Sequence, residues 1–240
     1  MTRLVSSVVA LTAVVFFAMA CPALAAQFFV AASTAPGLTR GAIIDGDKPL
    51  SLPEGARVTL IAPDGKTVTL DGPFHGPPGG GAGTDDGELF AALSDLVSSQ
   101  NASIASLGGT RGSPESVPED PFTVALGASG SHCVPASQPM RLWRPDTKGS
   151  SLLTIRPGSG SVPALVETLW PEGTAMMPWP KDLALEAGAT YLIYLVGGAS
   201  LTEVVLHRVP ADLPSEAHRI AWMAEHGCTR QALRLLEKLE

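Results

Sequence analysis

Hydrophobic and polar side chains alternate most clearly in two short runs, residues 57–62 and 66–70, on either side of Pro63-Asp64-Gly65. A period of two is typical of a β-strand, and a Pro-Asp-Gly turn between two such runs favours a hairpin in which the glycine takes a positive φ. The alternation places valines and leucines on one face, which we expect to be core, and threonines mainly on the other, which we expect to face water. The pattern predicts a β-hairpin.

Short β-type runs between turn-forming clusters also fill the second half of the chain, and strands at this spacing are typical of a β-sandwich. There the pattern Leu185-x-x-Gly188-x-x-Tyr191 resembles the tyrosine corner of immunoglobulin-like and fibronectin type III sandwiches. The resemblance implies that the Tyr191 hydroxyl bonds back to the chain a few residues upstream. The expected strands are residues 27–30, 122–126, 140–143, 152–156, 164–169, 190–196 and 201–209.

Three stretches follow a helical period instead: residues 88–98, 215–226 and 229–239. We expect Asp85 or Asp86 to cap the first helix, which should pack over the first sheet. Gly227 is the expected C-cap of the second helix and Thr229 the N-cap of the third. The last two helices resemble one tetratricopeptide-type hairpin, and we expect the pair to dock on the sandwich.

Together these patterns predict a mainly β protein with two small β-domains and a C-terminal helical hairpin. The 25 glycines and 21 prolines fit a chain of many turns and short strands. The expected division is a signal peptide at residues 1–25, a β-module with one helix at 27–107, a linker at 108–120, an immunoglobulin-like sandwich at 121–210 and a docked hairpin at 211–240.

The region around the hairpin, residues 41–76, resembles the FecR-type periplasmic domain. The resemblance rests on Gly46, Leu52-Pro53-Glu54-Gly55-Ala56, Val58-Thr59-Leu60, Pro63-Asp64-Gly65 and Leu70-Asp71-Gly72-Pro73. It implies a small β-rich module in the cell envelope, from a family of regulators that signal across the inner membrane to a sigma factor. Those regulators carry a cytoplasmic segment and a membrane span ahead of the module, whereas here we expect only a cleavable signal. Signalling through a membrane is therefore not carried over.

The N-terminal residues have the layout of a secretory signal peptide. Arg3 is followed by an apolar run at residues 4–20 and by the small-residue site Ala23-Leu24-Ala25. We expect cleavage after Ala25, export to the periplasm or beyond, and no stable membrane span in the mature chain. The alternative is a lipoprotein anchored at Cys21, although the position three residues earlier is Ala where such signals favour Leu.

Two cysteines, Cys133 and Cys228, remain after export. In an oxidising compartment a pair of this kind is most simply one disulfide. A zinc site with the neighbouring His132 and His226 is an alternative with unfavourable spacing, because adjacent residues do not easily ligate one ion. Free thiols are a third possibility, and Cys228 at a helix N-terminus would then be a reactive thiolate.

Chemistry-bearing motifs do not appear in the sequence. Residues 127–131, Gly-Ala-Ser-Gly-Ser, lack the final glycine of a nucleophile elbow, and no H-E-x-x-H, S-x-x-K or C-x-x-C occurs. Residues 80–85 open like a calcium-binding nonapeptide, but Gly87 replaces its large apolar residue and no second copy follows. We therefore predict no catalytic residue, cofactor or metal, while a triad assembled in space from distant residues stays open.

The net charge is −7 without any run of Lys or Arg, which argues against nucleic-acid binding. We expect a non-enzymatic envelope protein that acts by contact with a protein partner. The alternative is a carbohydrate-binding or hydrolase-accessory protein that uses exposed rings of Trp170 or Trp179, although burial between two sheets is the commoner fate of such a residue. The oligomeric state is not predicted.

Overall fold

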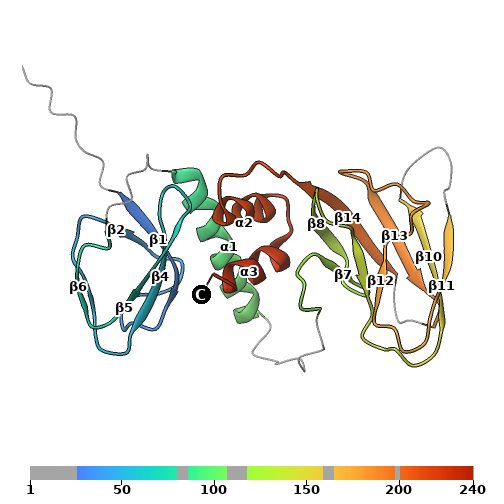
Figure 1. Ribbon diagram of the computed structural model, residues 1–240, viewed down its shortest axis with the longest axis horizontal. Helices are drawn as coiled ribbons and strands as arrows, with labels where there is room; N and C mark the ends of the chain where they lie inside the picture. The colour runs from blue at the N-terminus through green and yellow to red at the C-terminus, as the bar shows by residue number, and fades with distance from the viewer. Residues whose placement is uncertain (1–25, 80–85, 107–117, 159–164, 198–200, 240) are drawn as a thin grey trace, which may run out of the picture.

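The computed structural model describes residues 26–79, 86–106, 118–158, 165–197 and 201–239. The protein is mainly β, with two β-rich bodies at opposite ends of an elongated molecule and three helices between them (Figure 1). The predicted signal peptide, Cys21, residues 80–85 and most of the predicted linker lie outside the described residues. Within those residues no helix is both long and apolar enough to cross a bilayer.

The N-terminal body is built around the predicted hairpin. Strands β4 (Arg57–Ile61) and β5 (Thr67–Asp71) pair antiparallel, and Gly65 in the turn between them has a φ of +75°. Strands β1 (Gln27–Ser33) and β2 (Ile43–Asp45) extend the sheet in the order β2-β1-β4-β5. A separate two-stranded sheet joins β3 (Leu50–Leu52) to β6 (Phe74–Gly76).

Both faces of this sheet are covered over β1 and β4. Val58 and Leu60 lie in the core of the N-terminal body, as the alternation predicted. The expectation of a wet opposite face is wrong for β4, because Thr59 is 1% exposed and Ile61 packs into the helical layer. Thr67 and Thr69 of the edge strand β5 stay exposed on that side, as does the ion pair of Arg57 and Asp71 at one end of the hairpin. Helices therefore cover a surface that the alternation alone assigns to water.

The C-terminal body is a sandwich of two sheets. The larger sheet has the order β11-β10-β13-β14-β8 and the smaller one β12-β9-β7, and side chains from both fill one hydrophobic core. The strands are β7 (Thr123–Ala125), β8 (Gly130–Pro135), β9 (Arg141–Trp143), β10 (Ser151–Pro157), β11 (Val166–Trp170), β12 (Met176–Pro178), β13 (Thr190–Leu195) and β14 (Thr202–Val209). The sequence did not predict β8, which runs parallel to β14, or the short β12.

Three helices occupy the middle of the molecule: α1 (Gly87–Ser106), α2 (Glu216–Glu225) and α3 (Thr229–Glu237). Asp86 accepts a hydrogen bond from the Leu89 N–H at the start of α1, as predicted, but the helix runs beyond residue 98. Ser215 caps α2. The prediction of Thr229 as N-cap is wrong, because Cys228 holds that position and makes no side-chain cap bond.

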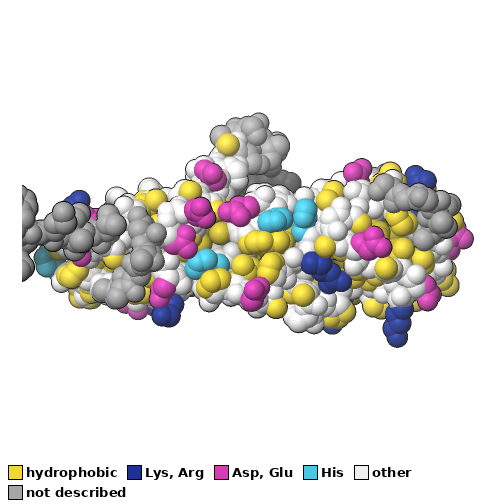
Figure 2. Space-filling model, turned by 90° about the horizontal axis from the view of Figure 1, so that it is seen from above, with side chains coloured by type: hydrophobic (Ala, Val, Ile, Leu, Met, Phe, Trp, Pro, Cys, Tyr) yellow, Lys and Arg dark blue, Asp and Glu magenta, His cyan; other side chains and the backbone are white. Residues whose placement is uncertain are grey.

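The helices form one hydrophobic layer with parts of both β-bodies. Buried side chains of α1, α2 and α3 pack with Phe29 and Ile61 of the N-terminal sheet and with Cys133 and Val209 of the sandwich. The expected helical hairpin therefore contacts the sandwich and, in addition, packs on α1 and on β1. In Figure 2 the middle of the molecule, where these helices lie, carries mainly Asp, Glu and His among its charged and titratable side chains.

Candidate functional site

The two tryptophans considered as ligand contacts are buried in the sandwich. Trp170 is fully covered, donates its indole N–H to the Thr174 carbonyl at 2.8 Å and lies under the guanidinium of Arg144. Trp179 is 7% exposed and donates to the Leu183 carbonyl at 2.9 Å. Neither ring offers a free face to a ligand, so both residues have the commoner fate, burial between sheets, and the alternative of ligand contact through Trp170 or Trp179 has no support. Packing between sheets and a bonded indole N–H explain both residues.

Tyr191 forms the predicted tyrosine corner. Its hydroxyl donates to the Ala184 carbonyl and accepts from the Glu186 N–H, both at 2.8 Å, so the ring pins the segment five to seven residues upstream. The ring also meets Trp179 edge to face, with centroids 5.0 Å apart. The residue is structural.

Cys133 on β8 and Cys228 before α3 form a disulfide, which confirms the leading interpretation of the cysteines. The zinc-site and free-thiol alternatives are therefore wrong. His132 donates from Nε2 to the Phe122 carbonyl at 3.2 Å, and His226 donates from Nδ1 to the Trp222 carbonyl at 2.8 Å. Among the residues that the structure describes, no three His, Cys, Asp or Glu side chains lie together in a way that could hold a metal ion.

Two histidines near this disulfide have lowered pKa values. Burial of the ring lowers the pKa of His132 to about 4. Burial also lowers the pKa of His207 on β14, and the His226 ring, whose centroid is 5.5 Å away, adds to that effect. Both shifts favour the neutral ring, because a charged imidazolium is poorly solvated where the hairpin meets the sandwich.

Gln231 of α3 completes the free edge of β8 and is 6% exposed. Its Oε1 accepts from the Cys133 N–H, and its Nε2 donates to the carbonyls of Cys133 and Pro121, each at 2.8 Å. The side-chain amide thereby stands in for a neighbouring strand and satisfies an otherwise unpaired edge. The disulfide and this amide attach α3 to the sandwich at the same residue.

The structure assembles a Ser, a His and an Asp that the sequence analysis did not bring together. His218 Nε2 lies 3.1 Å from Asp86 Oδ2, and its Nδ1 lies 2.8 Å from Ser215 Oγ. A carboxylate only accepts hydrogen bonds, so a neutral ring carries its proton on Nε2 and accepts the serine proton on Nδ1. Serine directly before a helical stretch is a typical N-cap residue, and this is the sequence signal that points to half of the arrangement.

This constellation has the composition of a catalytic triad, but its contacts are those of a structural junction. Asp86 also caps α1, and Ser215 Oγ accepts from the backbone N–H of His218 as the cap of α2. The turn at Gly65 packs directly on the serine, because a Cβ at residue 65 would overlap Ser215 Oγ. A nucleophile needs free approach to a carbonyl carbon, which this contact obstructs. We interpret the three residues as a link between two helix starts and the β4–β5 turn.

Exposed apolar side chains collect on the outer side of the larger sandwich sheet. Leu152 pairs directly with Leu169 across β10 and β11, and Tyr194 of β13 lies opposite Thr154, on the same side as Leu152. Their inward neighbours Leu153 and Trp170 are fully buried. We call this surface the outer sheet face, and its apolar members, each between 39% and 62% exposed, are Leu152, Leu169, Tyr194 and Val196.

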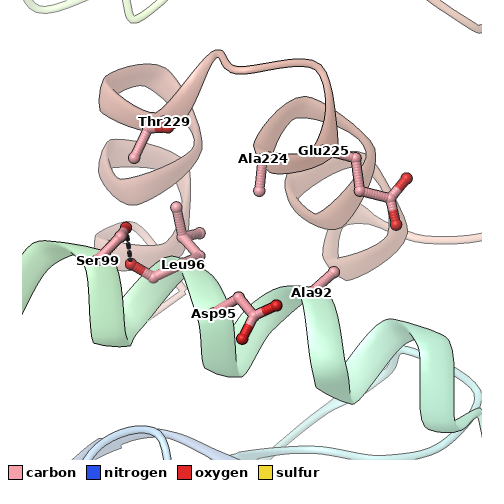
Figure 3. A pocket seen from close by; sticks show the side chains of 7 residues that line it. All are labelled: Ala92, Asp95, Leu96, Ser99, Ala224, Glu225 and Thr229. Atoms are coloured by element: carbon pink, nitrogen blue, oxygen red, sulfur yellow. Dashed lines mark hydrogen bonds between the residues drawn. The ribbon is translucent and has the colours of Figure 1, made fainter.

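A shallow groove of about 270 Å³ lies between α1 and the junction of α2 and α3 (Figure 3). We call it the helical groove. Most of its lining surface is apolar, and the carboxylates of Asp95 and Glu225 come to it from different helices. Its lining residues are Ala92, Asp95, Leu96, Ser99, Ala224, Glu225 and Thr229.

No family model, curated protein or solved structure matches the chain. The resemblance to the FecR-type domain therefore stays a prediction that rests on the turn and strand residues of the hairpin region.

Proposed function

We propose that this chain is an exported, non-enzymatic protein that binds a folded partner protein through the outer sheet face. The observation that carries the proposal is the group of large apolar side chains exposed together on one side of one sheet. Single exposed leucines are ordinary on protein surfaces, whereas a contiguous apolar group usually marks an interaction surface.

The composition of the face supports a protein rather than a small ligand. Leu169 and Leu152 form a cross-strand pair that Val196 extends, since its N–H bonds to the Leu152 carbonyl. The charged side chains of Glu167 and Arg156 lie on the same side of the strands, next to this apolar centre. An apolar centre with a charged border is the usual anatomy of a protein interface.

The disulfide supports export, because such bonds form and persist in oxidising compartments. The proposed location is the periplasm or the extracellular space. The FecR-type resemblance favours the envelope. The carbohydrate-binding alternative finds no support in Trp170 and Trp179, since both are buried.

The test is site-specific photo-cross-linking in intact cells. A photoreactive phenylalanine analogue replaces Tyr194 on the outer sheet face, and a matched chain carries it at Lys181, which is exposed on the turn after β12. We expect one discrete cross-linked species from the first position and none from the second. The captured protein is then purified, and its affinity is measured for the wild-type chain and for Leu169→Lys.

Leu169 is 62% exposed, so its replacement leaves the fold intact and isolates binding. We expect the dissociation constant of Leu169→Lys to be at least tenfold higher than that of the wild-type chain. Burial of one leucine side chain contributes about 1.5 to 3 kcal/mol to the free energy of binding. Equal cross-linking from both positions, or unchanged affinity of the variant, would contradict the proposal. A cross-linked species of twice the chain's mass would show instead that the face pairs two copies.

A further inference from the structure

We propose that the helical groove is a second binding surface, one that takes a basic side chain from an amphipathic segment of a partner polypeptide. Its floor is made by Ala92, Leu96 and Ala224, and two carboxylates, those of Asp95 and Glu225, border it. Both acidic residues are exposed, and among the described residues neither takes part in a salt bridge. The groove therefore combines apolar surface with uncompensated negative charge.

This combination matches the chemistry of lysine and arginine. Both side chains carry an aliphatic stem that covers apolar surface and a charged head that stays near water or an acid. With its stem on Leu96 and the two alanines, such a side chain brings its head toward Asp95 and Glu225. Thr229 also lines the groove, whereas the Ser99 hydroxyl donates to the Leu96 carbonyl at 2.7 Å.

Other classes of ligand fit the groove less well. Nucleic acids and anionic lipids carry phosphates, which two carboxylates repel. A calcium ion takes about six to eight oxygen ligands, and two carboxylates with two hydroxyls, one of them already engaged, fall short of that number. A cationic polypeptide satisfies both the charge and the apolar floor.

The position of the groove adds to the argument. The net charge of the chain is −7, and the face of the middle region seen in Figure 2 carries mainly acidic and His side chains, while α2 and α3 also contain Arg219, Arg230 and Arg234. A surface of one sign attracts a partner of the other and raises the rate of encounter. The groove lies on the helical layer and shares no residue with the outer sheet face, so this proposal does not rest on the proposed function.

The experiment uses the mature chain and a short fluorescent peptide in which Lys and Leu recur at helical spacing, with binding followed by fluorescence anisotropy. One variant combines Asp95→Asn with Glu225→Gln. Its matched control combines Glu172→Gln with Glu186→Gln, two exposed positions of the sandwich, so both variants lose the same charge. A third variant, Ala92→Leu, fills the floor and leaves the charge unchanged.

We expect the groove variant to bind the peptide roughly three- to tenfold more weakly than wild type, the range expected for two exposed ion pairs. The control should change less than twofold, and Ala92→Leu should also weaken binding. Circular dichroism checks that each variant is folded, and raised salt should weaken wild-type binding.

Three results would overturn the inference. Equal loss in the groove variant and its charge control would show only general attraction to an acidic protein. No binding of the Lys/Leu peptide, or equal binding of a peptide with Glu in place of Lys, would exclude a basic side chain as the occupant. Sedimentation of the chain as a dimer that Ala92→Leu dissociates would assign the groove to a second copy.

Discussion

Removing the polar atoms of Gln231 should destabilise the protein more than any exposed glutamine exchange. In Gln231→Met the side chain keeps nearly the same length but loses three hydrogen bonds, each 2.8 Å long in the structure. The N–H and carbonyl of Cys133, at the edge of β8, then have no hydrogen-bond partner from α3. The Pro121 carbonyl, which lies outside β8, also loses its partner. The site is buried, which keeps water from replacing the amide.

The size of the effect follows from the groups left unpaired. A buried donor or acceptor without a partner costs about 1 to 3 kcal/mol, and the carbonyls tolerate the loss better than the N–H. The expected loss in the free energy of unfolding is therefore about 2 to 5 kcal/mol. Gln138→Met is the matched control, because Gln138 is exposed and the same exchange there should change stability by less than about 0.5 kcal/mol.

Urea unfolding of the oxidised protein at neutral pH, followed by circular dichroism, measures the difference. Hydrogen exchange supplies a local readout, since the amide of Cys133 should lose protection in Gln231→Met and keep it in the control. A Gln231→Met protein as stable as wild type, with that amide still protected, would refute the role given to the side chain as a substitute strand.

Three further predictions concern the sandwich and its junction with α3. Replacing Cys133 and Cys228 together by Ala should lower the free energy of unfolding by up to about 4 to 5 kcal/mol, because the disulfide spans 95 residues, and urea unfolding checks this. Tyr191→Phe should cost about 1 to 3 kcal/mol through the two lost hydrogen bonds, whereas the same exchange at the exposed Tyr194 should leave the thermal midpoint unchanged. The lowered pKa of His132, about 4, means that the folded protein resists protonation, so stability should be full above pH 6.5 and fall by on the order of 3 kcal/mol as pH drops from 6.5 to 4. His132→Asn should remove this part of the pH dependence, measured as the free energy of unfolding in urea titrations at several pH values. If the variant shows the same pH dependence as wild type, the role given to His132 is contradicted.

Local signals in the sequence were enough to predict the elements whose residues show a clear hydrophobic period or a recognisable turn. The hairpin at Gly65, the tyrosine corner and the two C-terminal helices follow from alternation, a fixed spacing and helical stripes. Strand β8 was not predicted, because hydrophobic and polar side chains do not alternate from Gly130 to Pro135. Its pairing partner β14 lies about 70 residues away in the sequence. Its stability comes from β14, Gln231 and the disulfide rather than from its own residues.

Features that depend on distant contacts could not be predicted. The alternation in β4 correctly marked Val58 as core but assigned the side of Thr59 to solvent, since nothing local shows that helices cover it. The link from Asp86 to His218 joins residues 132 positions apart, so only the capping half of it leaves a local trace. Burial of Trp170 and Trp179 was favoured by residue type alone, but the partners that bury them meet only in the folded chain.

The shared helical layer determines when the N-terminal body can complete its folding. Phe29 and Ile61 belong to the first strands of the chain, yet they pack with Leu235 and Leu236 near its end. In a chain that emerges from its N-terminus, α1 can cover part of this side of the first sheet, but the hydrophobic layer is complete only when the last helix has been made. Deletion of the final turns of α3 would therefore first destabilise the N-terminal sheet, which is built from the opposite end of the polypeptide.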